Sequence, residues 1–166
     1  MSQELTIRKA TEADTELLSS LIQKSFYDVA VRFALTKQNC PKHPSNCTPD
    51  WIASDLLRGV RYFIANLENI AFGCVGLEAP NASGRYLERL AVLPEYRRRG
   101  FGRSLVEHVV KEARRDRALS IGIGIIADQH ELKAWYERQG FRETETRTFP
   151  HLPFRVTLMN LRLLEV

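Results

Sequence analysis

In the first third of the chain, the two-residue hydrophobic period of a strand is followed by the hydrophobic period of a helix. Residues 4–9 (ELTIRK) alternate apolar and polar side chains, which predicts a half-buried strand. Thr11 followed by Asp14 resembles a capping box and predicts the start of an amphipathic helix. The apolar residues of that helix recur at helical spacing: Leu17, Leu18, Leu21 and Ile22. A polar, proline-containing stretch at 36–49 ends this helical region.

A second helix and a group of strands follow. Thr48 as N-cap and Pro49 at the first helical position predict a helix that stops at Gly59. Three segments then have strand-like patterns: 61–67, 69–77 and 84–93. Because turn-like residues separate these segments, we expect an antiparallel meander.

The last part of the chain alternates helix and strand. One face of a helix after residue 100 carries the apolar residues Leu105, Val106, Val109, Val110 and Ala113. Residues 120–127 (SIGIGIIA) predict a fully buried strand, and a helix ending at Gly140 follows it. Two strands, at about 141–149 and 154–163, complete the pattern. This order of elements predicts a mixed α/β (α+β) fold.

Length and composition favour one domain spanning residues 1–166, with 44% apolar and 27% charged residues. The formal net charge of +4 is modest, so it argues only weakly for an anionic partner. No apolar run approaches the roughly 18–20 residues of a membrane-spanning helix. The first ten residues lack the apolar core of a secretory signal, so we expect a cytoplasmic protein with reduced thiols and no membrane partner.

The densest candidate chemistry is the segment YRRRGFGRSL, residues 96–105. Gly100 and Gly102 allow a tight turn and close backbone approach to a ligand. The N–H groups at the start of the following helix bind phosphate readily, and the arginines add charge-assisted donors. The Walker pattern is excluded because no Gly-Lys-Ser/Thr follows, and the dinucleotide fingerprint lacks its third glycine. A solvated arginine-rich turn remains the alternative from this loop alone.

Two sequence motifs, which follow one another along the chain, bear on the function of this loop. The segment LERLAVLPEYRRRGFGRSLVEHVV resembles the acetyl-CoA motif of the GNAT superfamily of N-acetyltransferases, and ELKAWYERQGF at 131–141 matches its second block. The resemblance covers residues 84–141. It implies a mostly antiparallel sheet of about six or seven strands with splayed central strands and about four flanking helices. Many members carry an asparagine at the start of the last helix, where this chain has Asp128, Gln129 and His130.

The resemblance also implies how acetyl-CoA would bind, with no metal. The pyrophosphate would lie on the loop N–H groups, and the pantetheine arm would pair with the preceding strand. The implied cofactor-binding residues are Leu90, Ala91, Val92, Arg97, Arg98, Arg99, Gly100, Phe101, Gly102, Arg103 and Ser104. In the neighbouring strand, Ile121, Ile123 and Ile125 fill one face, while Gly122 and Gly124 leave room on the other for a ligand or a packed helix.

Two residues are candidates for catalysis. Glu88 is the candidate general base, on the same strand face as Leu90 and Val92 unless a bulge intervenes, where apolar neighbours raise a carboxyl pKa. A salt bridge between Glu88 and a neighbouring arginine is the alternative. Tyr136 matches the family's tyrosine that donates a proton to the cofactor sulfur. The backbone N–H near Val92 is the candidate oxyanion donor.

Cys40, His43 and Cys47 lie within eight positions, which is typical of metal ligands. Structural zinc needs four ligands, however, and no adjacent fourth is evident. A disulfide between the cysteines is disfavoured in a reducing compartment. We therefore expect an ordered loop that shapes the acceptor site, with wall residues Tyr27, Arg32, His43 and Trp51.

Together these features predict an acetyl-CoA-dependent N-acetyltransferase that acts on a primary amine of a small molecule or peptide through a ternary complex. No cysteine lies in either motif, which argues against a covalent acetyl-enzyme. The alternative is a non-catalytic coenzyme A-binding or sensing module. Nucleic-acid binding is disfavoured because the arginine cluster lacks interleaved aromatic residues. Assembly of a homodimer through the final strands is left open.

Overall fold

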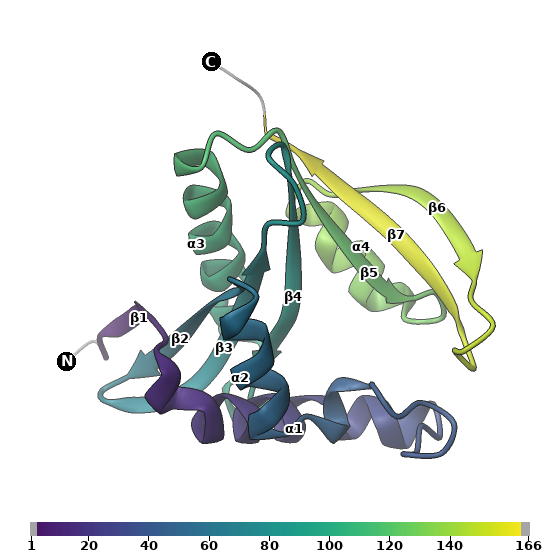
Figure 1. The fold of residues 1–166 in the computed structure, drawn as a ribbon, viewed down its shortest axis with the longest axis horizontal. Coiled ribbons are helices and arrows are strands. Elements are labelled where there is room, and N and C mark those ends of the chain that lie inside the picture. The colour runs from purple at the N-terminus through teal and green to yellow at the C-terminus, as the bar shows by residue number, and fades with distance from the viewer. Residues whose placement is uncertain (1–2, 164–166) are drawn as a thin grey trace.

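A computed structural model describes residues 3–163 of the chain. Its centre is a seven-stranded sheet in the order β1-β2-β3-β4-β5-β7-β6 (Figure 1). The strands are β1 (Leu5–Lys9), β2 (Arg61–Leu67), β3 (Ile70–Glu78), β4 (Gly84–Val92), β5 (Ser120–Ile126), β6 (Arg142–Thr148) and β7 (Arg155–Arg162). The α-helices are α1 (Thr15–Arg32), α2 (Pro49–Leu57), α3 (Phe101–Arg115) and α4 (His130–Arg138). All neighbouring strands are antiparallel except β4 and β5, so the predicted α/β fold and meander are confirmed.

Local sequence signals set the ends of the first two helices. Thr11 and Asp14 form the predicted capping box, in which the Thr11 N–H donates to Asp14 Oδ2 at 2.8 Å. This box caps a short 3₁₀ turn, and α1 begins just after it, at Thr15. Thr48 Oγ1 accepts the N–H of Trp51 at 3.3 Å and caps α2 as predicted.

Two hydrophobic cores lie on opposite faces of the sheet. The larger core packs α3 and α4 against the sheet, and it includes Phe72, Leu105, Phe141 and the three isoleucines of β5 that the sequence placed on one face, Ile121, Ile123 and Ile125. The smaller core packs α1 and α2 against β2, β3 and β4, and it includes Leu18, Ile22, Ile52, Ile64 and Cys74. The sheet is therefore covered from both sides over β2–β4.

The parallel strands β4 and β5 pair over only three positions, and pairing ends at Tyr86 and Gly122. Beyond this point the strands diverge, and α1 crosses below the opening between them (Figure 1). The expected splay of the central strands is therefore present. The remainder of the β4 edge faces the gap without a neighbouring strand.

A β-bulge changes the faces of β4. Glu88 lies opposite Gly76 and Ala91 opposite Cys74, so one β3 residue faces two residues of β4. Arg89 in the bulge has a φ of 50°. Because the bulge reverses the alternation, Leu90 and Val92 pack on the α3/α4 core, whereas Glu88 lies on the α1/α2 face. The exception stated for an intervening bulge therefore applies, and Glu88 does not share a face with Leu90 and Val92.

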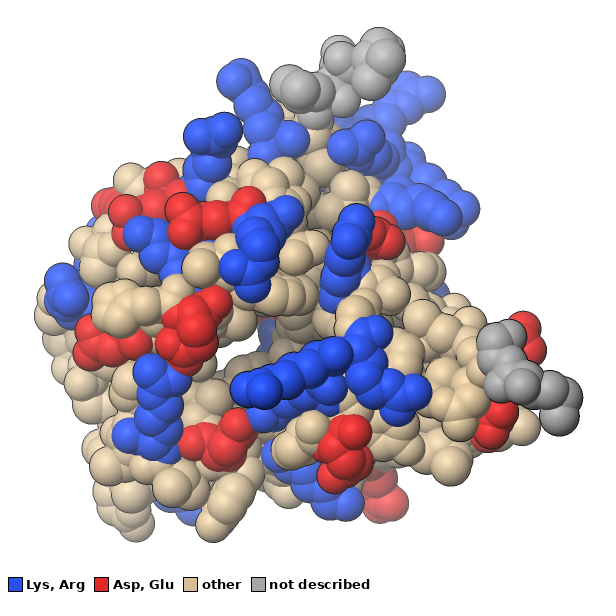
Figure 2. All heavy atoms as spheres, turned by 180° about the vertical axis from the view of Figure 1, so that it is seen from behind, with Lys and Arg blue, Asp and Glu red and all other residues tan. Residues whose placement is uncertain are grey.

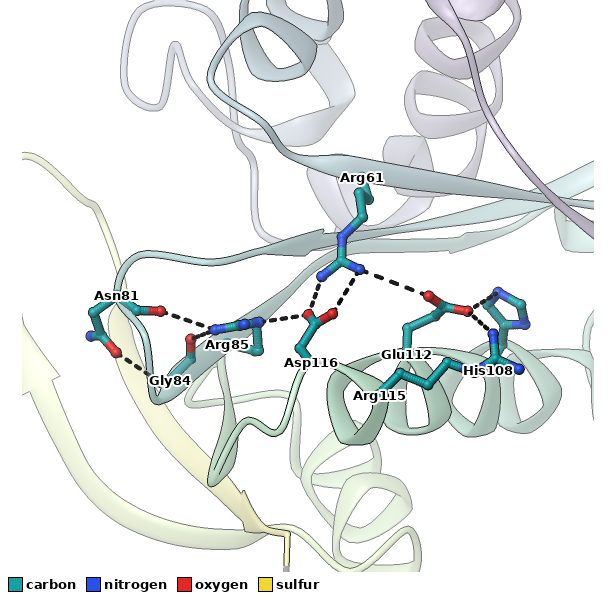
Figure 3. A network of polar contacts seen from close by, with 8 residues as sticks. All are labelled: Arg61, Asn81, Gly84, Arg85, His108, Glu112, Arg115 and Asp116. Carbon is teal, nitrogen blue, oxygen red and sulfur yellow. Dashed lines mark hydrogen bonds and ion pairs between the residues drawn. The ribbon is translucent and has the colours of Figure 1, made fainter.

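An ion-pair network joins the strands to the end of α3 (Figure 3). The buried Arg85 donates through Nε to Asp116 Oδ2 at 2.9 Å, and Arg61 donates to the same carboxylate. Arg85 also donates to the backbone carbonyls of Asn81 and Gly84 at 2.9 and 2.8 Å. The network fixes the β3–β4 turn and α3 relative to one another.

Within residues 3–163, no helix combines the length and the apolar character that crossing a membrane requires.

Candidate active site

A cavity of about 540 Å³ lies where the end of β4, the start of α3, α1 and α4 meet. From the side of α3 and α4, the molecule is hollowed, and Lys and Arg side chains edge the hollow (Figure 2). The lining residues are Ser25, Phe26, Asp28, Val29, Arg32, Leu90, Val92, Tyr96, Arg97, Arg98, Gly100, Phe101, Gly102, Arg103, Gln129, Glu131, Leu132, Trp135 and Arg138. The cavity therefore adjoins the gap between β4 and β5.

The start of α3 presents free backbone donors to this cavity. None of the N–H groups from Arg98 to Arg103 has an acceptor within the described part of the chain. Gly100 has a φ of 82°, a conformation that favours glycine, and it precedes the first helical residue. A Cβ on Gly102 would lie 3.3 Å from Trp135 Cζ2, so the glycine allows α4 to approach the helix start. The positive end of the α3 dipole adds to these donors, which suits a phosphate.

The arginines around the cavity differ in how they are used. Arg98 and Arg138 have no acidic partner among residues 3–163. Arg103 pairs with Glu107 at the surface, with Nε and Oε1 2.9 Å apart. Arg97 donates to the Val92 carbonyl at 3.0 Å, to the Ser25 carbonyl at 2.5 Å and to Asp28 Oδ2 at 2.6 Å. Its guanidinium therefore connects α1 to the end of β4.

Most of the cofactor-binding residues predicted from the sequence line the cavity, and three do not. Ala91 is buried in the α1/α2 core. The Arg99 side chain turns away, lies over the Phe101 ring and donates to Gln3 at 3.3 Å. Ser104 donates through Oγ to the Gly100 carbonyl at 3.2 Å. The side chains of Arg99 and Ser104 are thus directed elsewhere, although the Arg99 N–H belongs to the set of free donors.

Glu88 is paired with another carboxyl group. Glu78 lies opposite Tyr86 and Gly76 opposite Glu88, so the two glutamates are diagonal neighbours on one sheet face. Their side chains are close enough for each to shift the pKa of the other. Burial, followed by hydrogen bonding with Glu78 and the negative charge of Glu78, raises the pKa of Glu88 to about 8. The predicted alternative, a salt bridge from Glu88 to an arginine, is not found within residues 3–163.

Charged groups on α2 hold this pair. Arg58 donates to Glu78 Oε1 at 2.5 Å and to Asp55 Oδ1 at 2.7 Å. The interaction with Glu88 and the hydrogen bonds from Arg58 lower the pKa of Glu78, whereas the pKa of Glu88 is raised. Arg89 pairs with Asp55 instead of Glu88.

Tyr62 completes the polar cluster under the sheet face. Its hydroxyl donates to Asp55 Oδ2 at 2.7 Å and accepts from Arg89 Nη1 at 2.7 Å. These contacts hold the Arg89 guanidinium within the protein. Its Cζ atom lies 5.6 Å from the centroid of the Trp51 ring. Within this cluster Asp55 is ion-paired with Arg58 and Arg89, whereas Glu88 interacts with the carboxyl group of Glu78.

Tyr136 lies in the α3/α4 core next to the cavity but is not among the lining residues. Its ring packs edge-on against Trp135 and Phe141, with centroids 5.0 and 5.4 Å away. Its hydroxyl makes no hydrogen bond within the described residues, and burial raises the pKa of Tyr136. The phenol would therefore stay protonated at neutral pH, as a proton donor must.

The structure adds cavity residues that sequence reasoning missed. Ser25, Phe26, Asp28 and Val29 come from α1, whose sequence pattern signalled only a packed amphipathic helix. Trp135 could have been found, because it directly precedes Tyr136 in the second motif block.

Residues of the predicted acceptor wall have different environments. Arg32 lines the cavity, Tyr27 is 68% exposed, and His43 is buried, which lowers its pKa to about 4. Cys40 and Cys47 are free thiols in separate core clusters. No group of three or more His, Cys, Asp or Glu side chains in residues 3–163 is arranged to hold a metal.

Comparison with known proteins gives consistent results. Residues 58–143 match the family model described as acetyltransferase (GNAT) domain. The PaiA N-acetyltransferase of Thermoplasma acidophilum, solved with coenzyme A, is 16% identical with a TM-score of 0.80, over 96% of this chain and 99% of that chain. The ribosomal-protein-S18-alanine N-acetyltransferase of Escherichia coli is 18% identical with a TM-score of 0.78, over 98% and 96%.

A GNAT acetyltransferase of Elizabethkingia anophelis, solved with acetyl-CoA bound, is 18% identical with a TM-score of 0.70, over 96% of this chain and 98% of that chain. None of the curated proteins matches the sequence. The solved structures therefore share the fold of this chain, and the family model shows its membership.

Proposed function

Because the chain belongs to the GNAT acetyltransferase family, we propose that it transfers the acetyl group of acetyl-CoA directly to a primary amine of a small molecule or peptide. The observation that carries this proposal is the start of α3. There, free N–H groups from Arg98 to Arg103 and the arginines at 98 and 138 surround a cavity that adjoins the open edge of β4.

These residues fit an acyl donor of this kind. The N–H groups and arginines would hold the diphosphate, and Leu90 and Val92 would offer backbone groups to the amide-containing arm. The open β4 edge beyond Tyr86 leaves space for the arm to lie beside the strand. The acetyl group would then reach the gap between β4 and β5.

The acceptor would approach from the α1/α2 face, where Glu88 lies. An amine arrives mostly as ammonium, and the ionised Glu88 would take its proton. A carboxyl group with a pKa of about 8 is a stronger base than an ordinary glutamate and is closer to an amine in strength. The neutral amine then attacks the thioester carbonyl carbon.

The C–S bond breaks as the C–N bond forms, and Tyr136 would give the departing thiolate its proton. The attacking nitrogen loses one further proton as the amide forms. This loss balances the proton that the thiolate gains from Tyr136. Cys40, Cys47 and Cys74 do not line the cavity, and burial raises the pKa of all three. Their position supports direct transfer within a ternary complex over a covalent acetyl-cysteine.

The test is release of free thiol from acetyl-CoA in the presence of a panel of amines, paired with calorimetry of coenzyme A binding. The panel includes peptides with free N-termini, lysine, polyamines, aminoglycosides and amino acids. We expect binding and amine-dependent thiol release. Binding without turnover of any amine would favour a coenzyme A sensor, and a folded protein that neither binds nor turns over would overturn the proposal.

A further inference from the structure

Ser25 carries a buried hydroxyl without a partner. Its Oγ atom is fully shielded from solvent, and no hydrogen-bond partner for it is found within residues 3–163. The residue is 5% exposed. Leaving a buried polar group unsatisfied is unfavourable, so such a group is a candidate contact for a bound ligand.

A second serine of the same helix shows the normal arrangement. Ser19 is also 5% exposed, and its Oγ donates to the Glu16 carbonyl at 3.0 Å. Both residues lie on buried positions of α1. Burial within a helix therefore does not by itself leave a hydroxyl unpaired in this protein.

Ser25 lines the cavity beside the end of β4. One guanidinium fixes this position, because Arg97 donates to both the Ser25 carbonyl at 2.5 Å and the Val92 carbonyl at 3.0 Å. Phe26 and Val29 from α1 and Leu90 from β4 also line this cavity, together with the ion pair of Arg97 and Asp28. A hydroxyl without a protein partner in this lining suits a ligand that brings a hydrogen-bond acceptor of its own.

We propose that Ser25 is a binding residue for the acyl donor and that its hydroxyl donates a hydrogen bond to an amide carbonyl of the donor's arm, where the arm passes β4. This inference rests on the proposed function, since it takes the donor to be a coenzyme A thioester. The arm supplies amide carbonyl oxygens, which an O–H donor can satisfy without any charge.

The experiment measures the affinity of Ser25→Ala and of Ser19→Ala for two ligands. Neither ligand carries an acetyl group, so no turnover takes place. Coenzyme A contains the arm, whereas adenosine 3′,5′-bisphosphate lacks it. For Ser25→Ala we expect coenzyme A affinity to fall about fivefold to twentyfold, with unchanged affinity for the bisphosphate. The denaturant midpoint of Ser25→Ala should stay equal or rise, because the free protein loses no hydrogen bond. Ser19→Ala should do the opposite, lowering the midpoint and leaving both affinities unchanged.

Three results would overturn this assignment. The first is wild-type affinity of Ser25→Ala for coenzyme A, and the second is an equal loss for both ligands, which would place the effect at the nucleotide end. The third is a fall in the midpoint like that of Ser19→Ala, which would show that the hydroxyl is bonded within the free protein. If the wild type binds the bisphosphate and coenzyme A but acetylates no amine, the catalytic proposal fails while the Ser25 contact stands. If it binds neither, both fall together.

Discussion

Arg97 of the loop before α3 is ion-paired with Asp28 of α1, with Nη1 and Oδ2 2.6 Å apart, at the edge of the cavity. The same guanidinium donates to backbone carbonyls of Ser25 and Val92. Arg97 therefore has a structural task in the free protein, since it joins the helix below the cavity to the strand beside it.

This arrangement predicts unequal effects for the two partners. Asp28→Ala removes a largely exposed ion pair and should lower the free energy of unfolding by less than about 1 kcal/mol. Arg97→Ala also removes the donor to the Val92 carbonyl and a second hydrogen bond to the Ser25 carbonyl of α1, and should cost about 2–3 kcal/mol. Chemical denaturation of both variants measures the difference. Equal losses would show that the ion pair, and not the backbone bonds, holds the junction.

Gly100 should be required for ligand binding as well as for local conformation. Its φ is 82°, and alanine there costs about 1–2 kcal/mol or shifts the loop that carries the N–H donors. We expect Gly100→Ala to weaken coenzyme A binding about tenfold, as measured by calorimetry.

Gly59, after α2, gives a matched control for this substitution. It has a φ of 92°, and at both glycines the position that a Cβ would occupy has no other atom within 4 Å. Gly59→Ala should lower stability by a similar amount and leave coenzyme A affinity unchanged. Equal affinity losses in both variants would mean that general destabilisation, not the loop, is responsible.

The paired carboxyl groups predict the pH dependence of the reaction. Burial and Glu78 raise the pKa of Glu88 to about 8, so the base form accumulates, and kcat/KM should rise, as the pH passes through about 8. Glu78→Gln removes the neighbouring negative charge and should move this midpoint to lower pH. Glu16→Gln, at an exposed position of α1, should leave the profile unchanged. A wild-type midpoint after Glu78→Gln would contradict the pairing.

Stability should reflect the same proton. The folded protein binds the Glu88 proton more tightly than the unfolded chain, so this contribution is present below pH 4.5 and is lost as the pH rises to about 8. Glu88→Gln should flatten that part of the curve of unfolding free energy against pH. Denaturation at a series of pH values from about 4 to about 9 tests this without any substrate, and parallel curves for the two proteins would refute it.

Tyr136→Phe should separate binding from proton donation. Removing the hydroxyl should lower turnover about a hundredfold, the scale of a general acid, while coenzyme A affinity stays the same. Wild-type turnover by Tyr136→Phe would remove this residue from the mechanism.

Periodicity and local signals were enough to predict the elements and the glycine-containing turn before α3. The caps at Thr11 and Thr48 lie where the sequence placed them, because a cap depends on residues three positions apart. The glycines of the loop were identifiable for a similar reason, since a left-handed backbone position restricts the residue type locally. The sequence by itself thus determined the order of strands and helices and the position of the glycine-containing turn before α3.

The tertiary structure decided which side chains meet. The bulge at Arg89 moves Glu88 to the face opposite Leu90 and Val92, and the sheet register then brings Glu88 beside Glu78, ten residues away along the chain. Ser25 reaches the cavity only because α1 crosses below the gap between β4 and β5. Register, bulges and helix crossings arise from packing between distant segments, so local periodicity carries no record of them.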